Sequence, residues 1–317
     1  MINSIKIEKS FIEGLNSENT KKAYNSDLSQ FFTFIKKTHE DIRRDDILKF
    51  RKHLQEIGGR NGDPSAPYSI ARKLSALKTY FQYLAEQNII DTNPFINISP
   101  PSRSIKKERE IFTIEEIERM IAETSSSQAG PLHAALIAVN FYAVIRLSEF
   151  LSAKLEDFTS SDNLYFLNVK TKGNKFQKKE IPSPAVERIV DYINWMRSTK
   201  RSMNPKEYLF RPTRNNHQGS SNIDKPLNPS TVNRLLKKYA KQAGIFKSIS
   251  SHSGRASSIT NYLSLTEKEF GNADIYGAKT LAGHSKISTT ELYDKKRRDD
   301  SVKGKLTSLL EQTKKMP

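Results

Sequence analysis

A polar stretch with two adjacent prolines divides this chain into two segments. Residues 99–110 read SPPSRSIKKERE, and prolines followed by charged side chains favour an extended, solvated backbone. We place a linker at residues 101–110, with one domain in residues 1–100 and a second in residues 111–317. Each segment is long enough to bury a hydrophobic core of its own. The sequence therefore predicts two domains.

Basic side chains are concentrated in the second segment. The whole chain holds 52 lysines and arginines against 35 aspartates and glutamates, a formal net charge of +17. Residues 1–102 carry 15 basic and 12 acidic side chains, net +3, whereas residues 103–317 carry 37 and 23, net +14. Such an excess fits a surface that meets nucleic acid phosphates, although a protein that is merely basic has the same composition.

Other features of the composition limit where the chain works. It contains no cysteine, which excludes disulfides and cysteine-based zinc sites and fits a reducing compartment. The N-terminal residues lack the basic start and apolar run of a signal peptide, and no stretch approaches the ~18 apolar residues of a membrane span. We expect a soluble, cytoplasmic protein with no membrane partner.

The first segment is predicted to be helical. Apolar residues recur at three- and four-residue spacing from residue 20 to 35, from 47 to 57 and from 69 to 84. The second of these helices is expected to end at the glycine pair 58–59. The polar face of the third carries cations that can face either solvent or nucleic acid: Arg72, Lys73 and Lys78.

The second segment is predicted to be mainly α-helical with a small antiparallel β-sheet. A capping box of Thr113 and Glu116 starts a helix. Residues 132–139 form the inward stripe of a further helix, whose C-terminal region is expected to bring Arg146 and Glu149. A strand at residues 164–169, a turn at 171–174 and a strand ending at Ile181 predict a hairpin.

Further helices are expected to start at two proline-containing sites. Ser183-Pro184 opens one, with an apolar face that we expect in the core: Val186, Ile189, Val190, Ile193 and Trp195. The sequence Asn228-Pro229-Ser230 opens another, which is expected to end at Gly244. Residues 211–227, between these helices, are polar and are predicted to form an exposed loop.

Several side chains in the second segment suit metal-free phosphoryl transfer. Attack on a phosphodiester builds negative charge on its non-bridging oxygens, and an arginine fork can bind two of these oxygens at once. Arg146 and Arg255 are the candidate clamps. Glu149, one helical turn after Arg146, either orients the guanidinium or forms an ordinary ion pair.

Proton transfer would require groups beside these arginines. Lys172 precedes a glycine at the predicted hairpin tip and is the candidate general acid, although Lys175 is close enough to compete. His252 would accept a proton or hydrogen-bond the phosphate, and His284 would donate another hydrogen bond to it. The histidines have no third ligand at zinc-like spacing, so we predict no metal and no cofactor.

Tyr293 is the candidate nucleophile, because a phenol can displace one ester oxygen in line. It follows a second predicted capping box at residues 288–291, which places it in the first turns of a helix. The residues that follow it, 295–298, read KKRR and are strongly basic.

These motifs resemble those of the tyrosine recombinases, the phage integrase family. The most specific are RLSE at residues 146–149, HSGR at 252–255 and LAGHSKISTTELY at 281–293. Residues 20–95 resemble the helical, SAM-like core-binding domain, and residues 108–300 the catalytic domain. The resemblance implies a covalent 3′-phosphotyrosyl link to Tyr293, with the other candidates gathered around the scissile phosphate: Arg146, Lys172, His252, Arg255 and His284.

The resemblance also implies what such a protein acts on. It predicts a site-specific recombinase that cleaves and religates double-stranded DNA at specific sites, for integration, excision or resolution, without metal or ATP. It further implies a homotetramer in the nucleoid, aided by accessory DNA-bending proteins. The tail at residues 301–310 has helical spacing and would dock on a neighbouring protomer or pack on its own domain.

The chain departs from the family pattern at several positions. Val144-Ile145 stands where a glycine usually precedes the first arginine, so we expect a different local backbone. Gly254 replaces a common leucine, and Ala256 a common histidine. The stretch from His252 to His284 is a few residues longer than usual, and we place the extra length in residues 265–277.

Two alternatives to the recombinase remain. A type IB topoisomerase or a hairpin telomere resolvase would use the same chemistry, and would differ in relaxing supercoiled DNA without a special site or in forming hairpin products. A DNA-binding relative with a decayed catalytic centre is a non-enzymatic alternative, which the full set of candidate residues disfavours.

Overall fold

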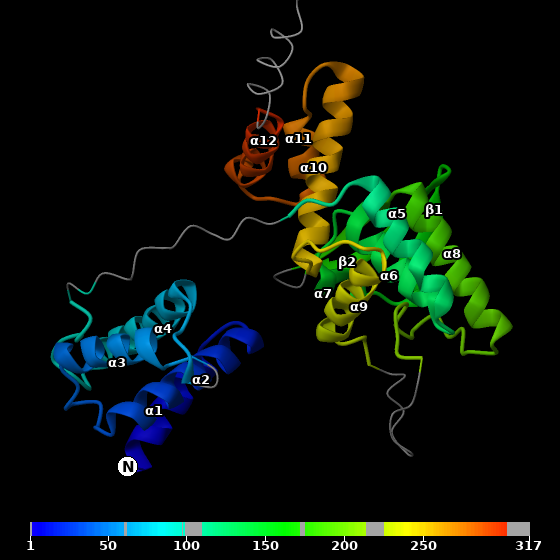
Figure 1. The fold of residues 1–317 in the computed structure, drawn as a ribbon. Helices are drawn as coiled ribbons and strands as arrows, with labels where there is room; N and C mark the ends of the chain where they lie inside the picture. The colour runs from blue at the N-terminus through cyan, green and yellow to red at the C-terminus, as the bar shows by residue number, and fades with distance from the viewer. Residues whose placement is uncertain are drawn as a thin grey trace, which may run out of the picture. The chain divides into compact units, whose positions relative to one another are not determined.

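The computed structural model describes two compact units. The residues described are 2–59, 62–96, 98, 110–171, 175–213 and 225–302, and the units lie within residues 1–107 and 108–317 (Figure 1). The linker predicted at 101–110 lies outside the described residues apart from Glu110. In the described part of the chain, no helix is both long and apolar enough to cross a membrane.

The smaller unit is helical, as predicted. It contains α1 (Ile2–Glu13), α2 (Glu18–Ile35), α3 (Arg44–Glu56) and α4 (Pro67–Glu86). The last three correspond to the predicted helices, whereas α1 was not predicted. Aromatic rings hold the unit together: Phe31 packs edge-on against Phe50 and Phe81, and Phe11 of α1 packs against Tyr80.

The larger unit is mainly helical with one small sheet. Its elements in chain order are α5 (Ile114–Ala122), the 3₁₀ turn η2 (Glu123–Ser126), α6 (Gly130–Tyr142), α7 (Leu147–Leu151), the 3₁₀ turn η3 (Leu155–Asp157), β1 (Phe158–Ser161), β2 (Leu164–Thr171), β3 (Lys175–Ile181), α8 (Ser183–Ser198), α9 (Pro229–Gln242), α10 (Ser251–Phe270), α11 (Ile275–Ala282) and α12 (Ile287–Val302). The predicted capping box of Thr113 and Glu116 is present at the start of α5.

Helix α6 is the centre of the main hydrophobic core. It packs against α5, α8 and α10, and its residues 134–141 are all buried. The inward stripe predicted at residues 132–139 is confirmed, and neighbouring helices cover the other faces of this helix as well. The expectation that α6 itself brings Arg146 was wrong. The chain leaves α6 at Ala143 in an extended conformation, and Arg146 caps the separate helix α7.

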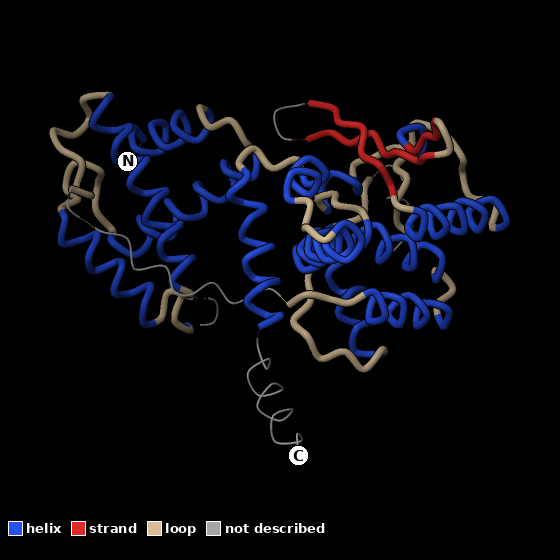
Figure 2. The backbone as a smooth tube through the Cα atoms, turned by 90° about the horizontal axis from the view of Figure 1, so that it is seen from above, coloured by secondary structure: helices blue, strands red, loops and turns tan. Residues whose placement is uncertain are grey.

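The sheet is antiparallel, with the strand order β1-β2-β3 (Figure 2). The predicted hairpin is confirmed as β2 and β3, which pair in a register that places Lys179 opposite Leu167 and Ile181 opposite Tyr165. The first strand, β1, was not predicted. The turn residues 172–174, with the candidate general acid Lys172, lie outside the described residues.

Burial in α8 and in the predicted loop after it differs from the prediction in both directions. The buried face of α8 consists of Ala185, Val186, Ile189, Tyr192 and Met196, whereas Val190, Ile193 and Trp195 are only half-buried at its flanks. Arg211 and Leu227, near the ends of the predicted exposed loop, are buried. Residues 214–224 of that loop lie outside the described residues.

A second, smaller core joins the last three helices. Ile259 and Leu263 of α10 pack against Ala278 and Ala282 of α11, and Tyr293 of α12 packs partly buried against them. Figure 1 shows α11 and α12 lying beside α10. This satellite core therefore sets the position of the candidate nucleophile, while the main core sets that of Arg146.

Candidate active site

Arg146 and Glu149 are locked together at the start of α7. One carboxylate oxygen of Glu149 accepts a hydrogen bond from the Arg146 main-chain N–H at 3.0 Å, and the other accepts one from Arg146 Nη1 at 2.7 Å. Glu149 is buried, whereas 47% of the Arg146 side chain is exposed. The carboxylate therefore directs the guanidinium and still leaves it accessible to a ligand.

Arg255 joins two segments that are distant in the sequence. Its Nη1 donates to the main-chain oxygen of Val144 at 2.8 Å, and its Nη2 donates to that of Ala282. Burial and then the nearby Arg146 lower the pKa of Arg255, while Glu149 and Tyr293 act in the opposite direction. A guanidinium has five N–H donors, so these two contacts leave donors for a ligand. Arg255 thus lies among Arg146, Glu149 and Tyr293.

The departure from glycine before the first arginine has a structural role. Val144 does not adopt a left-handed conformation, and its carbonyl is one of the two that hold Arg255. Its side chain packs against the satellite core of α10 and α11. The valine therefore links the Arg146 segment to the helices that carry the later motifs.

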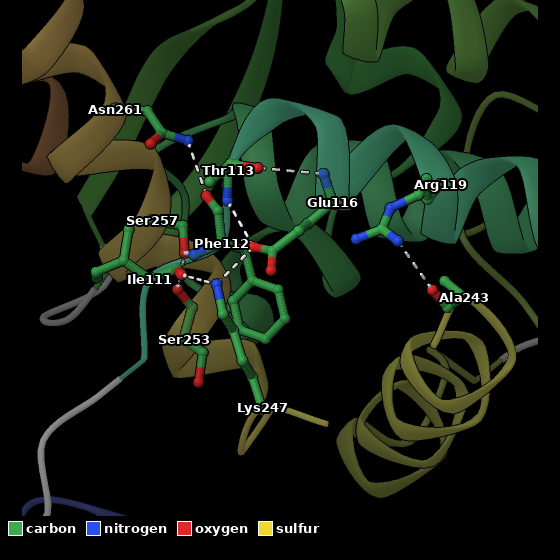
Figure 3. A network of polar contacts seen from close by, with 10 residues as sticks. All are labelled: Ile111, Phe112, Thr113, Glu116, Arg119, Ala243, Lys247, Ser253, Ser257 and Asn261. Atoms are coloured by element: carbon green, nitrogen blue, oxygen red, sulfur yellow. Dashed lines mark hydrogen bonds and ion pairs between the residues drawn. The ribbon is translucent and has the colours of Figure 1, made fainter. Parts of the chain in front are cut away.

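A network of polar contacts fixes α10, the helix of His252 and Arg255 (Figure 3). The main-chain N–H of Phe112 donates to Ser257 Oγ at 2.9 Å, and Asn261 Nδ2 donates to the Phe112 carbonyl at 3.2 Å. Lys247, just before α10, forms an ion pair with Glu116 of α5 at 2.7 Å. The first two bonds hold α10 to Phe112, just before α5, and the ion pair holds the segment before α10 to α5 itself.

Gly254 allows α10 to approach α6 closely. A Cβ at this position would lie 2.0 Å from Asn140 Nδ2 and 2.6 Å from the Asn140 main-chain oxygen, closer than any side chain tolerates. One turn later, Ser258 Oγ donates to the Phe141 carbonyl at 2.7 Å. The leucine that the resemblance predicts at position 254 would not fit between these helices, so this departure follows from the packing.

His284 follows the left-handed Gly283 at the end of α11. Its Nδ1 is hydrogen-bonded to the buried Thr290 hydroxyl at 2.9 Å, and its ring stacks on that of Tyr293 with centroids 6.1 Å apart. Burial, followed by Arg255, Arg146 and Lys179, lowers the pKa of His284 to about 4. The imidazole is therefore neutral near pH 7.

Tyr293 lies in the second turn of α12 and is half-buried. The helix begins at Ile287, so Ser288 lies inside it and not at the predicted capping position. The basic sequence after the tyrosine is partly neutralised. Arg297 forms ion pairs with Asp294 at 2.7 Å and with Glu267 of α10, which ties α12 to α10.

Two further candidates are less closely tied to this cluster. His252 is exposed in the first turn of α10, three residues before Arg255 and hence on the same side of the helix. Lys175 is exposed at the start of β3. Lys172 lies outside the described residues, so its position relative to the arginines stays a prediction.

Lys179 was not predicted as a site residue. Its Nζ donates to the Leu281 carbonyl at 3.0 Å, next to the Gly283–His284 turn. Burial, and then Arg255 and Arg146, lower the pKa of Lys179, while Glu149 raises it. Strand alternation provides a signal that could have found it, because Lys179 lies two residues before the buried Ile181 and so shares its face.

The cations predicted to bind DNA in the smaller unit differ in their surroundings. Arg72 forms an ion pair with the buried Asp27 through both Nη atoms, and Lys73 donates to Gln30. Lys78 is exposed. Arg72 therefore also serves the packing of α4 on α2. Among the residues described, no three His, Asp or Glu side chains are grouped so that they could hold a metal ion.

Comparison with known families matches both units. The model described as "Phage integrase family" matches residues 110–299, and that described as "Phage integrase, N-terminal SAM-like domain" matches residues 8–88. The chain belongs to the phage integrase family. The motifs at residues 146–149, 252–255 and 281–293 all fall within the first match.

Curated relatives support the same identification over nearly the whole chain. A tyrosine recombinase of Thermosipho africanus (strain TCF52B) is 30% identical over 279 residues, which cover 88% of this chain and 89% of the relative. Tyrosine recombinase XerD of Halalkalibacterium halodurans is 27% identical over 283 residues, or 87% of each chain. Tyrosine recombinases cleave and rejoin DNA strands, and this chain is a recombinase of that kind.

Solved structures share the fold. A lambda integrase dimer bound to a COC′ core site has a TM-score of 0.66 at 17% identity, covering 91% of this chain and 75% of that one. XerH recombinase bound to a palindromic difH substrate, in a post-cleavage complex, has a TM-score of 0.64 at 17% identity, covering 90% and 78%.

Proposed function

We propose that this recombinase cleaves specific double-stranded DNA sites with Tyr293 as its nucleophile. The observation that carries the proposal is the bridge made by Arg255. Its guanidinium donates to the carbonyl of Val144, just before Arg146, and to that of Ala282, just before His284. The His284 ring in turn stacks on Tyr293. Two guanidinium groups, an imidazole and a phenol are thereby gathered in one unit.

In the proposed reaction, the phenol oxygen of Tyr293 attacks the phosphorus of a DNA phosphodiester. A bond from phosphorus to the tyrosine oxygen forms, and the bond to the 5′ oxygen breaks, which leaves a 3′-phosphotyrosyl ester and a free 5′ hydroxyl. His252 accepts the phenol proton and Lys172 protonates the leaving oxygen. Attack by a 5′ hydroxyl on the ester reverses these steps and releases Tyr293, so no ATP is consumed.

Arg146 and Arg255 meet the charge that develops on the non-bridging oxygens. Glu149 and two main-chain carbonyls hold these guanidinium groups before DNA arrives, so little reorganisation is needed in the transition state. His284 is bonded to Thr290 through Nδ1, which leaves Nε2 as the nitrogen to meet the phosphate. A neutral imidazole donates one hydrogen bond there.

We further propose that the working form is a homotetramer on paired DNA sites in the nucleoid. Relatives of the same fold support this: lambda integrase has been solved as a dimer on a core site and as a tetramer bound to a Holliday junction. Exposed lysines, among them Lys78 and Lys175, would contribute salt-dependent contacts to phosphates. Accessory DNA-bending proteins would assist the pairing of sites.

The test begins by sequencing DNA that is recovered covalently attached to the protein in cells, which identifies the site. A nicked suicide duplex of that site then traps the intermediate in vitro. We expect the Tyr293→Phe variant to bind this duplex and form no covalent complex. The matched control, Tyr276→Phe, alters a largely exposed tyrosine of α11 and should trap the complex normally.

A covalent complex that persists in Tyr293→Phe would contradict the assignment of the nucleophile. Relaxation of supercoiled DNA without any preferred site would instead indicate a topoisomerase, and hairpin products would indicate a telomere resolvase. The absence of any covalent complex with the wild-type protein would indicate a DNA-binding relative without catalysis.

A further inference from the structure

The C-terminal end of α11 has all four of its terminal carbonyls bonded. A helix leaves its last four carbonyls without helical partners. Those of Lys279 and Thr280 accept hydrogen bonds from the N–H groups of His284 at 3.1 Å and of Gly283 at 3.0 Å. The next carbonyl, of Leu281, accepts from Lys179 at 3.0 Å, and the last, of Ala282, accepts from Arg255. Two cations thus complete the end of the helix that leads into His284.

Lys179 reaches this helix end from the sheet. Its register partner Leu167 is fully buried, so the inner face of β3 carries Lys179 toward the interior of the unit. A Cβ on Gly283 would lie 3.4 Å from Lys179 Nζ and 3.5 Å from Gln177 Oε1. Both β3 side chains therefore lie directly against the turn that precedes His284.

We propose that Lys179 is a positioning residue for DNA strand cleavage, which anchors the Gly283–His284 turn to the sheet and so aligns His284 with Arg255. This inference rests on the proposed function. The ammonium also lies at the negative end of the α11 dipole, where a cation stabilises the helix. Lys179 and Arg255 bind the carbonyls of two consecutive residues, Leu281 and Ala282. Loss of the lysine would therefore leave the turn held by Arg255 without its bond to the sheet.

The charge of Lys179 acts on the same site. Among the described residues, the cations that act on His284 are Arg255, Arg146 and Lys179, and all three oppose a positive charge on its ring. The negative charge of Glu149 favours the charged forms of Lys179 and Arg255, because it raises the pKa of both groups. Removing the lysine charge therefore moves the pKa of His284 upward, although burial and the two arginines still lower it.

The experiment compares Lys179→Met with Lys179→Arg in the full-length protein. We expect Lys179→Met to form the covalent complex on the suicide duplex about tenfold to a hundredfold more slowly, with unchanged DNA affinity. Lys179→Arg keeps a charged donor and should recover most of the rate. The control is Lys178→Met, since Lys178 is exposed and its Nζ lies over the Phe166 ring at 4.0 Å.

A second measurement separates positioning from general loss of structure. The pKa of His284 is followed by NMR titration of its ring protons in a Tyr293→Phe background, where no cleavage occurs. We expect it to rise in Lys179→Met, and to match the wild-type background in Lys179→Arg and Lys178→Met. A thermal melt of each variant shows that it is folded under these conditions.

The outcomes distinguish this inference from the proposed function. Wild-type rates in Lys179→Met overturn the positioning role, and so does an unchanged His284 pKa in that variant. If the wild-type protein itself forms no complex through Tyr293, the proposed function fails. The titration then decides alone whether Lys179 controls the His284 turn.

Discussion

Arg146, Arg255 and His284 each have a partner that fixes the direction of the side chain. Glu149 holds Arg146, two main-chain carbonyls hold Arg255, and the Thr290 hydroxyl holds His284. Donors that are oriented before the substrate binds stabilise developing charge without reorganisation. At the residue scale, these supporting bonds determine the geometry of the site as much as the groups that are proposed to contact DNA.

Glu149→Gln tests this support directly. The amide keeps the shape of the side chain but loses the charge that pairs with Arg146 Nη1 at 2.7 Å. Only one of its two terminal atoms is an oxygen, so it cannot accept both hydrogen bonds from Arg146. Covalent complex formation should fall about tenfold to a hundredfold, while DNA binding is retained. The rate at which the covalent complex is trapped on a suicide duplex measures this loss.

The control for this substitution is Glu156→Gln, an exposed carboxylate in the 3₁₀ turn η3. It should trap the complex at the wild-type rate. Equal rates for Glu149→Gln and the wild type would show that the carboxylate does not orient the arginine for catalysis.

At the element scale, the arrangement of the candidate site depends on how closely α10 lies against α6. Gly254 lies directly on Asn140, Ser258 binds the Phe141 carbonyl, and both contacts fall within the turns that follow His252. The satellite core then positions α11 and α12 on the other end of α10. One helix therefore aligns Arg255 with α12, the helix of the candidate nucleophile Tyr293.

Gly254→Ala should destabilise the larger unit. The added methyl group would lie 2.6 Å from the main-chain oxygen of Asn140, so the two helices must separate, which costs about 1–3 kcal/mol. Denaturant unfolding measures this loss. Gly14→Ala is the control, because its added Cβ meets only ordinary contacts of 3.5 Å or more. Equal stability of both variants would contradict the close helix contact.

Local patterns predicted elements where one segment carries the whole signal. The capping box of Thr113 and Glu116 and the β2–β3 hairpin were confirmed because neighbouring residues determine them. The capping box predicted at residues 288–291 was wrong, since α12 begins at Ile287, and the burial of Tyr192 by packing between distant helices was not predicted. Lys179 was missed for the same reason: its partner, Leu281, is 102 positions away.

At the scale of the whole molecule, some basic side chains form ion pairs within the fold, whereas others are exposed and available to phosphates. Residues 1–102 carry a net charge of only +3, and Arg72, one of the DNA-binding candidates there, pairs with the buried Asp27. The larger unit carries most of the excess. We therefore expect cations of the smaller unit to differ in whether they serve folding or DNA affinity.

Arg72→Ala and Lys78→Ala separate these roles. Arg72→Ala leaves Asp27 buried without its partner and should lower the free energy of unfolding by about 1–3 kcal/mol, since the arginine is partly exposed. Lys78→Ala should leave stability within about 0.5 kcal/mol. It should also reduce the salt dependence of DNA binding by roughly one phosphate contact.

Thermal unfolding and DNA binding at several salt concentrations measure the two effects. The reverse pattern, with an unstable Lys78→Ala and a stable Arg72→Ala, would contradict the division of roles. Equal salt dependence in Lys78→Ala and the wild type would remove Lys78 from the DNA-binding surface.

The most direct test of the central claim is mass spectrometry of the protein–DNA adduct. The trapped complex is digested with protease and nuclease, and the modified peptide is sequenced. We predict a nucleotide joined through its 3′ phosphate to Tyr293. An adduct on any other residue, or one joined through a 5′ phosphate, would contradict the account.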